Sequence, residues 1–309
     1  KGHCAQHIDH RDMNTLLYRK GKNPKTIISN IILYRAKADL KRRIIRTENF
    51  RKNYLNMTDP CRTTDEFVAL NKSFDCFITG SDQVWNCTRG LNSNFYLDFV
   101  SDDSKKCAYA ASFGVSQIPS YYSAEVSERL RAYRYITVRE NAGKRIVDEN
   151  CGRKVQNVCD PVFLLEAEQW RKIIFESSEL NLTNKKYIFV YSTDISDTFI
   201  QMVNKVKKHL HLPVISTTWL PGCSVVKDIG PSEFIDYIMH AECVVTTSFH
   251  ATAFSIIFHK NFYVLPHTTT GSRVTDILEK LNLTSHIVNK DTINISENLN
   301  YEQVQKKLD

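Results

Sequence analysis

The sequence of 309 residues contains few glycines and prolines, 10 and 8, and no long uninterrupted run of apolar residues. With 42% hydrophobic and 24% charged residues, this composition excludes collagen-like, low-complexity and largely disordered chains. No apolar run approaches the roughly 18 residues that a membrane-spanning helix needs. At about 150 residues per domain, the length predicts two domains, each with a full hydrophobic core.

Several catalytic and metal-binding motifs are absent too. Nine cysteines are scattered without a C-x-x-C pair, so neither a zinc knuckle nor a thioredoxin-type site is indicated. Cys76 and Cys243 lie in apolar, strand-like runs, where we expect buried, reduced thiols of a cytoplasmic protein. The sequence has no G-x-G-x-x-G, Walker A, G-x-S-x-G or H-E-x-x-H motif. These absences exclude nicotinamide-dependent enzymes, P-loop ATPases, α/β-hydrolases and zincins.

The net charge of +7 is concentrated near the start of the chain. Residues 1–60 hold 14 Lys and Arg against 5 Asp and Glu, whereas the rest is close to neutral. The basic core of this region, Tyr34–Leu55, has apolar residues at helical spacing. A solvated helix, contact with an anionic membrane surface and nucleic-acid binding are all open, although the segment lacks interleaved aromatic residues and a nucleic-acid motif.

Strand-like and helix-like segments alternate almost to the end of the chain, a pattern typical of parallel sheets covered on both faces. Strands are expected at Phe74–Thr79, Cys107–Ala111, Tyr135–Val138, Tyr187–Tyr191, Pro213–Ser216, Cys243–Thr246 and Phe262–Leu265. Helices are expected at Ala124–Ala132, Asn141–Asn150, Ala167–Glu176, Asp197–His209, Ser232–His240, Ala251–Phe258 and Arg273–Leu281. The predicted fold class is therefore α/β.

A domain boundary is expected after Asp160-Pro161. The helix Ala167–Glu176 and a polar stretch follow, and a new strand then starts a second sheet. We predict an N-terminal α/β lobe at 1–165, a connecting helix and linker at 166–186, and a C-terminal α/β lobe at 187–309. A cleft would lie between the two lobes.

Polar residues follow four of the predicted strands. In open α/β sheets ligands bind beyond the carboxyl ends of the strands, where backbone groups and helix N-termini point into the crevice. The segments at these positions are 80–86, 112–114, 139–140 and 247–252, and they contain Gly, Ser, Asp, Arg and His. This composition is typical of a ligand site rather than of an ordinary turn.

Ser248 and His250 belong to the last of these segments. Ser248 is a suitable N-cap for the helix at Ala251–Phe258, which directs free N–H groups and a positive dipole end at the cleft, as a phosphate requires. His250, in the first turn, can donate or accept a proton or bind the phosphate. The alternative is a helix cap followed by a histidine that packs against its neighbours.

Two arginines and an aspartate complete the candidates. Arg273 stands at a helix start, where a cation opposes the helix dipole, so an anionic partner would explain it; the alternative is a surface arginine. Arg139 follows a strand directly and precedes Glu140, so a structural ion pair is the alternative to an anion-binding role. Asp82 is a candidate general base or hydroxyl ligand, or only an Asx-turn residue.

These segments resemble the polysaccharide pyruvyl transferases. The most specific motifs are GSDQVWN at 80–86 and TTSFHATAFS at 246–255. Six further segments follow in the family's order: AASFG at 110–114, TVREN at 137–141, CDPVFLL at 159–165, EQW at 168–170, YIFVYS at 187–192 and GSRVTDILEKLNL at 271–283.

The chain departs from the family pattern in two places. Ala251 replaces the usual glycine, and the family's usual first strand is not found at the start of the N-terminal lobe.

The resemblance implies two Rossmann-like parallel-sheet lobes that face a cleft, an arrangement similar to GT-B glycosyltransferases. It implies transfer of the enolpyruvyl group of phosphoenolpyruvate to two hydroxyls of a sugar, with formation of a pyruvate ketal and release of phosphate. The sugar would belong to a polysaccharide, such as a capsule or exopolysaccharide, or to a lipid-linked oligosaccharide.

The resemblance also implies roles for the candidate residues. The expected catalytic residues are His250 and Asp82. The expected donor-binding residues, on the C-terminal side, are Arg273, Ser248, Arg139 and Ser272. The expected acceptor-binding residues, on the N-terminal side, are Ser81, Gln83, Trp85 and Asn86.

No metal or redox cofactor is expected, since phosphoenolpyruvate acts as a co-substrate and the segment with His3, His7 and His10 alternates like a strand. The expected partners are phosphoenolpyruvate and a sugar acceptor, without nucleic acid. The expected location is the cytoplasm, at the inner face of the cell membrane. There the basic Tyr34–Leu55 segment would contact anionic lipid.

Two other functions fit parts of the pattern. An ordinary GT-B glycosyltransferase with a nucleotide-sugar donor requires only a base-stacking pocket in the second lobe, which Trp219 or Tyr191 would supply. A non-catalytic glycan-binding relative is favoured by Ala251 and by the absent first strand alone.

Overall fold

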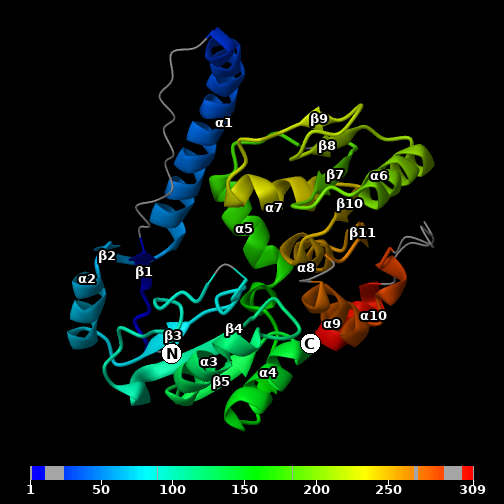
Figure 1. Ribbon diagram of the computed structural model, residues 1–309. Helices are drawn as coiled ribbons and strands as arrows, with labels where there is room; N and C mark the ends of the chain where they lie inside the picture. Colours follow the sequence, from blue (N-terminus) through cyan, green and yellow to red (C-terminus); the bar gives the residue numbers. More distant parts are fainter. Residues whose placement is uncertain are drawn as a thin grey trace.

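The computed structural model describes residues 2–10, 24–88, 90–182, 184–267, 271–288 and 301–308, with the backbone alone for 24–37 and 308. Every strand pair in its three sheets is parallel, and helices separate most of the strands. The α/β class predicted from the alternating pattern is therefore confirmed. Two larger sheets, which we call the first and the second sheet, are compatible with the GT-B-like arrangement (Figure 1).

The first sheet has the strand order β3-β4-β5-β6. Its strands are β3 (Phe77–Thr79), β4 (Lys106–Ala111), β5 (Tyr135–Val138) and β6 (Gln156–Asn157). The helices α3 (Ser120–Arg131) and α4 (Asn141–Cys151) connect β4 to β5 and β5 to β6. A separate two-stranded sheet is formed by β1 (His7–His10) and β2 (Met57–Cys61), and the short helix α2 (Thr64–Ala69) follows it.

The second sheet has the order β11-β10-β7-β8-β9. Its strands are β7 (Ile188–Tyr191), β8 (Val214–Ser216), β9 (Ser224–Val225), β10 (Cys243–Thr246) and β11 (Asn261–Val264). Its helices are α5 (Ala167–Ser177), α6 (Asp197–Leu210), α7 (Pro231–His240), α8 (Phe249–Ile257), α9 (Ser272–Leu281) and α10 (Tyr301–Leu308).

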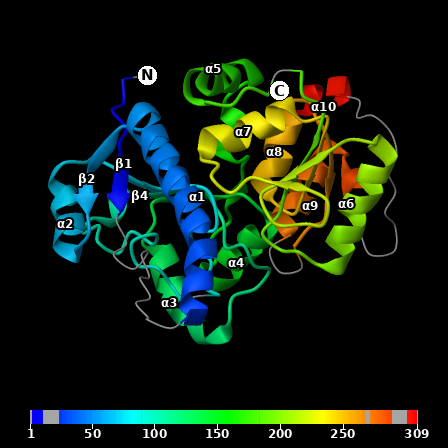
Figure 2. The ribbon, with the colours of Figure 1, turned by 90° about the horizontal axis from the view of Figure 1, so that it is seen from above.

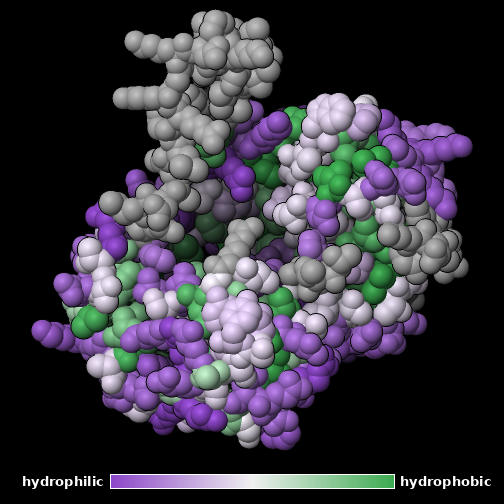
Figure 3. All heavy atoms as spheres, in the orientation of Figure 1, coloured by the Kyte–Doolittle hydropathy of each residue, from purple (hydrophilic) through white to green (hydrophobic). Residues whose placement is uncertain are grey.

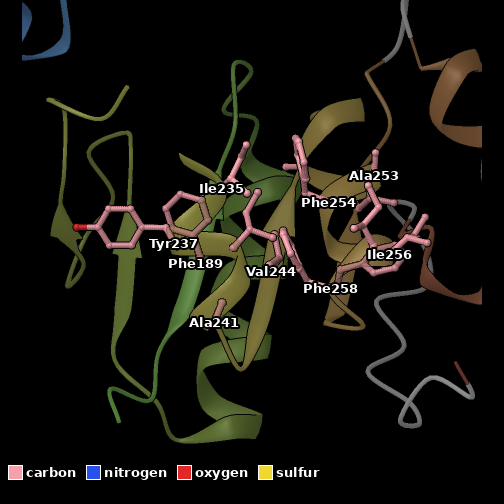
Figure 4. Close-up of a cluster of buried hydrophobic side chains, with 14 of the residues drawn as sticks. Phe189, Ile235, Tyr237, Ala241, Val244, Ala253, Phe254, Ile256 and Phe258 are labelled. Atoms are coloured by element: carbon pink, nitrogen blue, oxygen red, sulfur yellow. The ribbon is translucent and has the colours of Figure 1, made fainter. Parts of the chain in front are cut away.

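The second sheet is apolar on both faces, as a parallel sheet between helices must be. Phe189 and Val244 pack on one face against α7 and α8, where Ile235 and Phe254 belong to the same buried cluster (Figure 4). On the other face, Val190 and its neighbours pack against α6. This double cover fixes the sheet, so the residues after its strands start from a rigid support.

Helix α1 (Pro24–Tyr54) confirms the helix expected in the basic segment Tyr34–Leu55 and crosses between the two larger sheets in the view from above (Figure 2). Its side chains before residue 38 lie outside the described residues. Arg46 pairs with Asp228 at 3.1 Å and with the buried Glu233 at 3.4 Å. This pairing neutralises part of the charge of α1 within the molecule, whereas residues 40–45 are exposed, as a solvated helix face requires. The predicted domain limits at 165 and 186 stay a prediction.

The environment of the cysteines was predicted only in part. Cys243 is buried, as expected for a thiol in an apolar strand, but Cys76 is exposed. The reason is the alternation of β3, where Phe77 is buried and Ile78, on the same face as Cys76, is 63% exposed. Cys76 lies beside Cys107 of the neighbouring strand, with 3.6 Å between the sulfur atoms.

Candidate functional site

The residues after β3, β5 and β10 and at the start of α9 meet at one place, although they are far apart in the sequence. Arg139 follows β5 and donates hydrogen bonds to Asp160 and, over 3.2 Å, to Asp82. Arg273 reaches the same Asp82 carboxylate from α9 over 3.4 Å. His250, in the first turn of α8, places its Nε2 3.8 Å from Asp160. We call these five residues the arginine cluster; the space-filling view shows a hollow between the parts of the molecule that contain the two larger sheets (Figure 3).

Arg139 is the most buried member of the arginine cluster, with its side chain 2% exposed. Its guanidinium lies over the ring of Phe249 at 4.6 Å, and Arg273 approaches the same ring at 5.9 Å. Cation–π contacts of this kind hold the two guanidinium groups against α8. The Nε atom of Arg139 is buried and has no hydrogen-bond partner among the described residues. Arg139 therefore does form structural ion pairs, with Asp160 and Asp82, but these pairs do not use its Nε donor.

Asp82 is held in a conformation that favours glycine, with φ at +81°. Its backbone carbonyl accepts from the N–H of Ser112 at 3.0 Å, which ties the turn after β3 to the end of β4. Ala110, in β4, also has a positive φ of +52°. Strained residues other than glycine are concentrated at functional sites, because the surrounding structure must support them. The side chain is 59% exposed, so solvent or a ligand can reach the carboxylate while it is bound to two arginines.

The charges of the arginine cluster set its protonation. Burial alone would raise the pKa of Asp82, but His250 and Arg139 outweigh it and lower the pKa. Burial would likewise raise the pKa of Asp160, but the charge of Arg139 and the hydrogen bond from Ser81 outweigh it, so this pKa is also lowered. Burial lowers the pKa of His250, against the attraction of Asp160 and Asp82. Both carboxylates are thus ionised at neutral pH, while the His250 imidazole is mainly neutral.

A buried glutamate supports the loop beside Asp82. Glu140 caps α4 and accepts hydrogen bonds from the Ser112 hydroxyl at 2.9 Å and from the N–H of Phe113 at 3.0 Å. Its second carboxylate oxygen is buried without a partner among the described residues. Burial raises the pKa of Glu140, partly offset by the Ser112 hydrogen bond. Glu140 is thus fully buried and fixes the segment 112–114.

The structure places the predicted donor-binding residues around this cluster. Arg273 is 8% exposed and paired, so the alternative of a surface arginine is wrong. Ser248 caps α8, with its hydroxyl oxygen accepting from the N–H of Ala251 at 3.4 Å. The hydroxyl of Ser272 is buried and has no partner among the described residues. Ala251 is fully buried in the apolar cluster, so its methyl group packs inside the second sheet's core instead of facing the hollow.

The predicted acceptor-binding residues are only partly available to a ligand. The Ser81 hydroxyl donates to Asp160 at 2.7 Å, and Asn86 donates to Gln83 at 2.6 Å. Trp85, in contrast, is 1% exposed and stacks on Tyr96 in the core of the first sheet. We therefore correct its assignment, because the indole has no surface that a sugar can reach.

Sequence reasoning missed two members of this arrangement, Asp160 and Phe249. Asp160 follows β6, a strand of two residues that left no alternating pattern to recognise. The segment CDPVFLL contains Asp160, but its Asp-Pro step by itself predicts only the end of an element. Phe249 lies between two candidates, Ser248 and His250, and its ring contact with Arg139 depends on the packing of the two sheets.

Comparisons with known proteins identify the kind of chain that carries this arrangement. A family model described as polysaccharide pyruvyl transferase matches residues 8–269 of the 309. A comparison with the curated proteins finds no match. Asp82, Arg139, Asp160 and His250 lie inside the matched range, and Arg273 lies four residues beyond it.

Proposed function

The chain belongs to the polysaccharide pyruvyl transferase family, enzymes that transfer pyruvate to polysaccharide, and we propose that phosphoenolpyruvate is its donor and a pyruvate ketal its product. The observation that supports this proposal is the arginine cluster. Two guanidinium groups meet at Asp82 and at the first residue of α8, and the donor carries two anionic groups. These are a phosphate and a carboxylate about 4–5 Å apart by ordinary covalent geometry, which calls for more than one cationic contact.

In our proposal Arg273 and the N-terminus of α8 bind the two anionic groups of the donor, and Arg139 assists. Arg139 already shares its donors between Asp160 and Asp82, whereas its buried Nε is unused. The Ser272 hydroxyl, also buried without a described partner, is a further donor at the start of α9. These groups recognise the phosphate and carboxylate through charge-assisted hydrogen bonds.

His250 is our proposed acid and base. Binding of the anionic donor raises the pKa of a nearby histidine, so the imidazole takes up a proton when the donor is in place. That proton goes to the methylene carbon of phosphoenolpyruvate, which makes the neighbouring carbon electrophilic. A first sugar hydroxyl adds to this carbon and gives its proton to the neutral imidazole. A second hydroxyl then displaces phosphate, which leaves with the C–O bond electrons and the proton.

Asp82 fits a positioning role better than a base. Its lowered pKa means that the carboxylate holds a proton only weakly, so it is a poor acceptor of a hydroxyl proton. It can still accept a hydrogen bond from a sugar hydroxyl, together with Ser81, Gln83 and Asn86 nearby. The proposed reaction has no net change of oxidation state, so it requires no redox cofactor. In our proposal the guanidinium groups, and not a metal ion, neutralise the charge of the donor.

We also propose that the acceptor is linked to lipid, as part of capsule or exopolysaccharide synthesis, and that α1 contacts an anionic membrane at the cytoplasmic face. Leu40, Ile44 and Ile45 of α1 are 45–49% exposed and lie beside the exposed Lys41. Apolar and basic side chains together favour an interface with anionic lipid. No helix in the described part of the chain is long and apolar enough to cross a bilayer. Unchanged binding of the Lys41→Glu variant to phosphatidylglycerol vesicles would contradict the contact.

Thermal unfolding with phosphoenolpyruvate tests the proposed donor without knowledge of the acceptor. A ligand at 100 times its Kd adds about 2.7 kcal/mol to stability, which a melting curve resolves. We expect this stabilisation in the wild type and its loss in Arg273→Ala, while the exposed Arg171→Ala serves as a matched control. Stabilisation by nucleotide-sugars alone would favour a glycosyltransferase. Turnover that survives in His250→Ala would contradict the proposed acid and base.

A further inference from the structure

A cavity of about 650 Å³ lies between α1 and the second sheet. Its walls come from α1, from the loops after β7 and β8, and from the segment that leads into α7. The hydroxyls and aromatic rings of the wall belong to Thr47, Ser192, Thr217, Thr218, Tyr191 and Phe234. Pockets that bind small molecules typically have volumes of about 300–1,000 Å³.

The charged residues of this cavity are Arg43 and Lys227. None of the described residues that line it is acidic. On the same helix, Arg42 donates to Asp228 at 2.9 Å and Arg46 pairs with the same carboxylate at 3.1 Å. In the part of the chain that the structure describes, no carboxylate pairs with Arg43 or Lys227. The cavity therefore has a net positive charge and favours an anion.

The cavity wall is hydrogen-bonded, at the end of β7, to the segment that leads into His250. The chain runs from β7 to β8 on one side, whereas β10 lies on the other side of β7, so the direction of the connections changes between β7 and β10. Ligands of open α/β sheets bind at such a point. There Ser192, in the cavity wall, shares a hydrogen bond of 2.9 Å with Thr247. Ser248 and His250 follow directly in the chain.

From this arrangement we infer that the cavity binds a phosphate-bearing saccharide, with its phosphate at Arg43 and Lys227 and its sugar directed toward His250. The inference rests on the proposed function, because it makes this ligand the acceptor. A guanidinium and an ammonium group bind phosphate through charge-assisted hydrogen bonds. Serine and threonine hydroxyls pair with sugar hydroxyls, and the Tyr191 and Phe234 rings offer apolar surface to the C–H face of a sugar.

Calorimetric titration tests the inference. The probes are the α-1-phosphates of glucose, galactose, mannose and N-acetylglucosamine, each compared with its neutral methyl α-glycoside. We expect at least one phosphate to bind about tenfold or more tightly than its neutral counterpart. The double variant Arg43→Ala/Lys227→Ala should lose this preference, whereas Lys41→Ala, on the same helix but outside the cavity wall, should keep it. Failure of all four phosphates to bind, or unchanged binding by the double variant, would overturn the inference.

The arginine cluster also attracts anions, so the two sites must be separated. The phosphate preference should persist in Arg273→Ala, and the double variant should keep the stabilisation by phosphoenolpyruvate. If Arg273→Ala alone abolishes binding of the sugar phosphates, they occupy the arginine cluster and the inference is wrong. If phosphoenolpyruvate fails to stabilise the wild type while the double variant still loses the sugar phosphates, the proposed donor fails and the cavity site stands.

Two sources of the glycosyl phosphate can be distinguished in the same titration. One arm uses uridine diphosphate sugars, and the other uses the same sugars on farnesyl diphosphate. In either arm, binding that depends on Arg43 and Lys227 supports the site, and the tighter ligand identifies the source. Binding in both arms that is unaffected by the double variant would count against the site.

Discussion

The guanidinium of Arg139 lies 4.6 Å from the centre of the Phe249 ring, and this contact joins the two larger sheets. Arg139 comes directly after β5 of the first sheet, and Phe249 opens α8 after β10 of the second. The same guanidinium is held by Asp160, which follows β6. The carboxyl ends of strands from both sheets are thus linked through one buried cation, and His250 follows Phe249 directly in the chain.

The Asp160→Asn substitution tests this link. It keeps the shape of the side chain but removes the charge that balances buried Arg139, so we expect a loss of about 3–5 kcal/mol in the free energy of unfolding. Ser81→Ala removes only one hydrogen bond to Asp160 and should cost about 1 kcal/mol. Urea unfolding measures both values. Equal stability of Asp160→Asn and the wild type would show that the Arg139 charge is balanced by other groups.

Acidification should destabilise the fold through His250. Its pKa in the folded state is lowered, chiefly by burial, below the ordinary value of 6.5, so between these two values the unfolded chain binds more protons than the folded one. Stability is therefore expected to fall as pH drops through about 6.5. In the His250→Asn variant this part of the slope should disappear.

The groups that face His250 do not mask this effect. Asp82 and Asp160 have lowered pKa values and lose their contribution only at pH values below about 4. Urea unfolding at pH 7.5 and pH 5.5 gives the comparison. A slope that is the same in wild type and His250→Asn would contradict the lowered pKa of the histidine.

Much of the fold, but less of the site, could be predicted from the sequence. Hydrophobic periodicity located α4, α6 and α9, because each buries one regular stripe of apolar residues. The short β6 and β9, with two residues each, carry no such pattern. β2 escaped recognition because its sequence MTDPC contains an Asp-Pro step, which is typical of a turn.

Within the site, local rules found single residues but not their partners. The helix dipole argument predicted that Arg273 needs an anion, and the anion is Asp82, 191 residues earlier. For Trp85, the local sequence did not indicate the direction in which the side chain points. The turn at Asp82 brings the N–H of Trp85 to the carbonyl of Ser112 at 3.1 Å and directs the indole into the core. A one-dimensional pattern does not record that change of direction.

The core position of Trp85 can be separated from a role in acceptor binding. Truncation to alanine should cost about 3–5 kcal/mol, because a fully buried indole is removed from a packed aromatic cluster. Trp85→Phe keeps much of the apolar volume and should be folded. With this variant we expect an unchanged KM for the acceptor. A raised acceptor KM in a folded Trp85→Phe protein would return Trp85 to the acceptor site.

The close approach of α1 to α7 depends on Gly230. A methyl group at this position would lie 2.7 Å from the Cβ atom of Arg46 and 3.2 Å from its backbone carbonyl carbon. Since backbone cannot move aside cheaply, Gly230→Ala should push α1 away from α7, at a cost of about 1–3 kcal/mol in the free energy of unfolding. The shift would also open the cavity beside Arg43, so the sugar phosphates should bind more weakly. Gly80→Ala is the matched control for stability, because a methyl group there meets nothing within 4 Å. If Gly230→Ala is as stable as Gly80→Ala, then α1 does not rest on α7 as described.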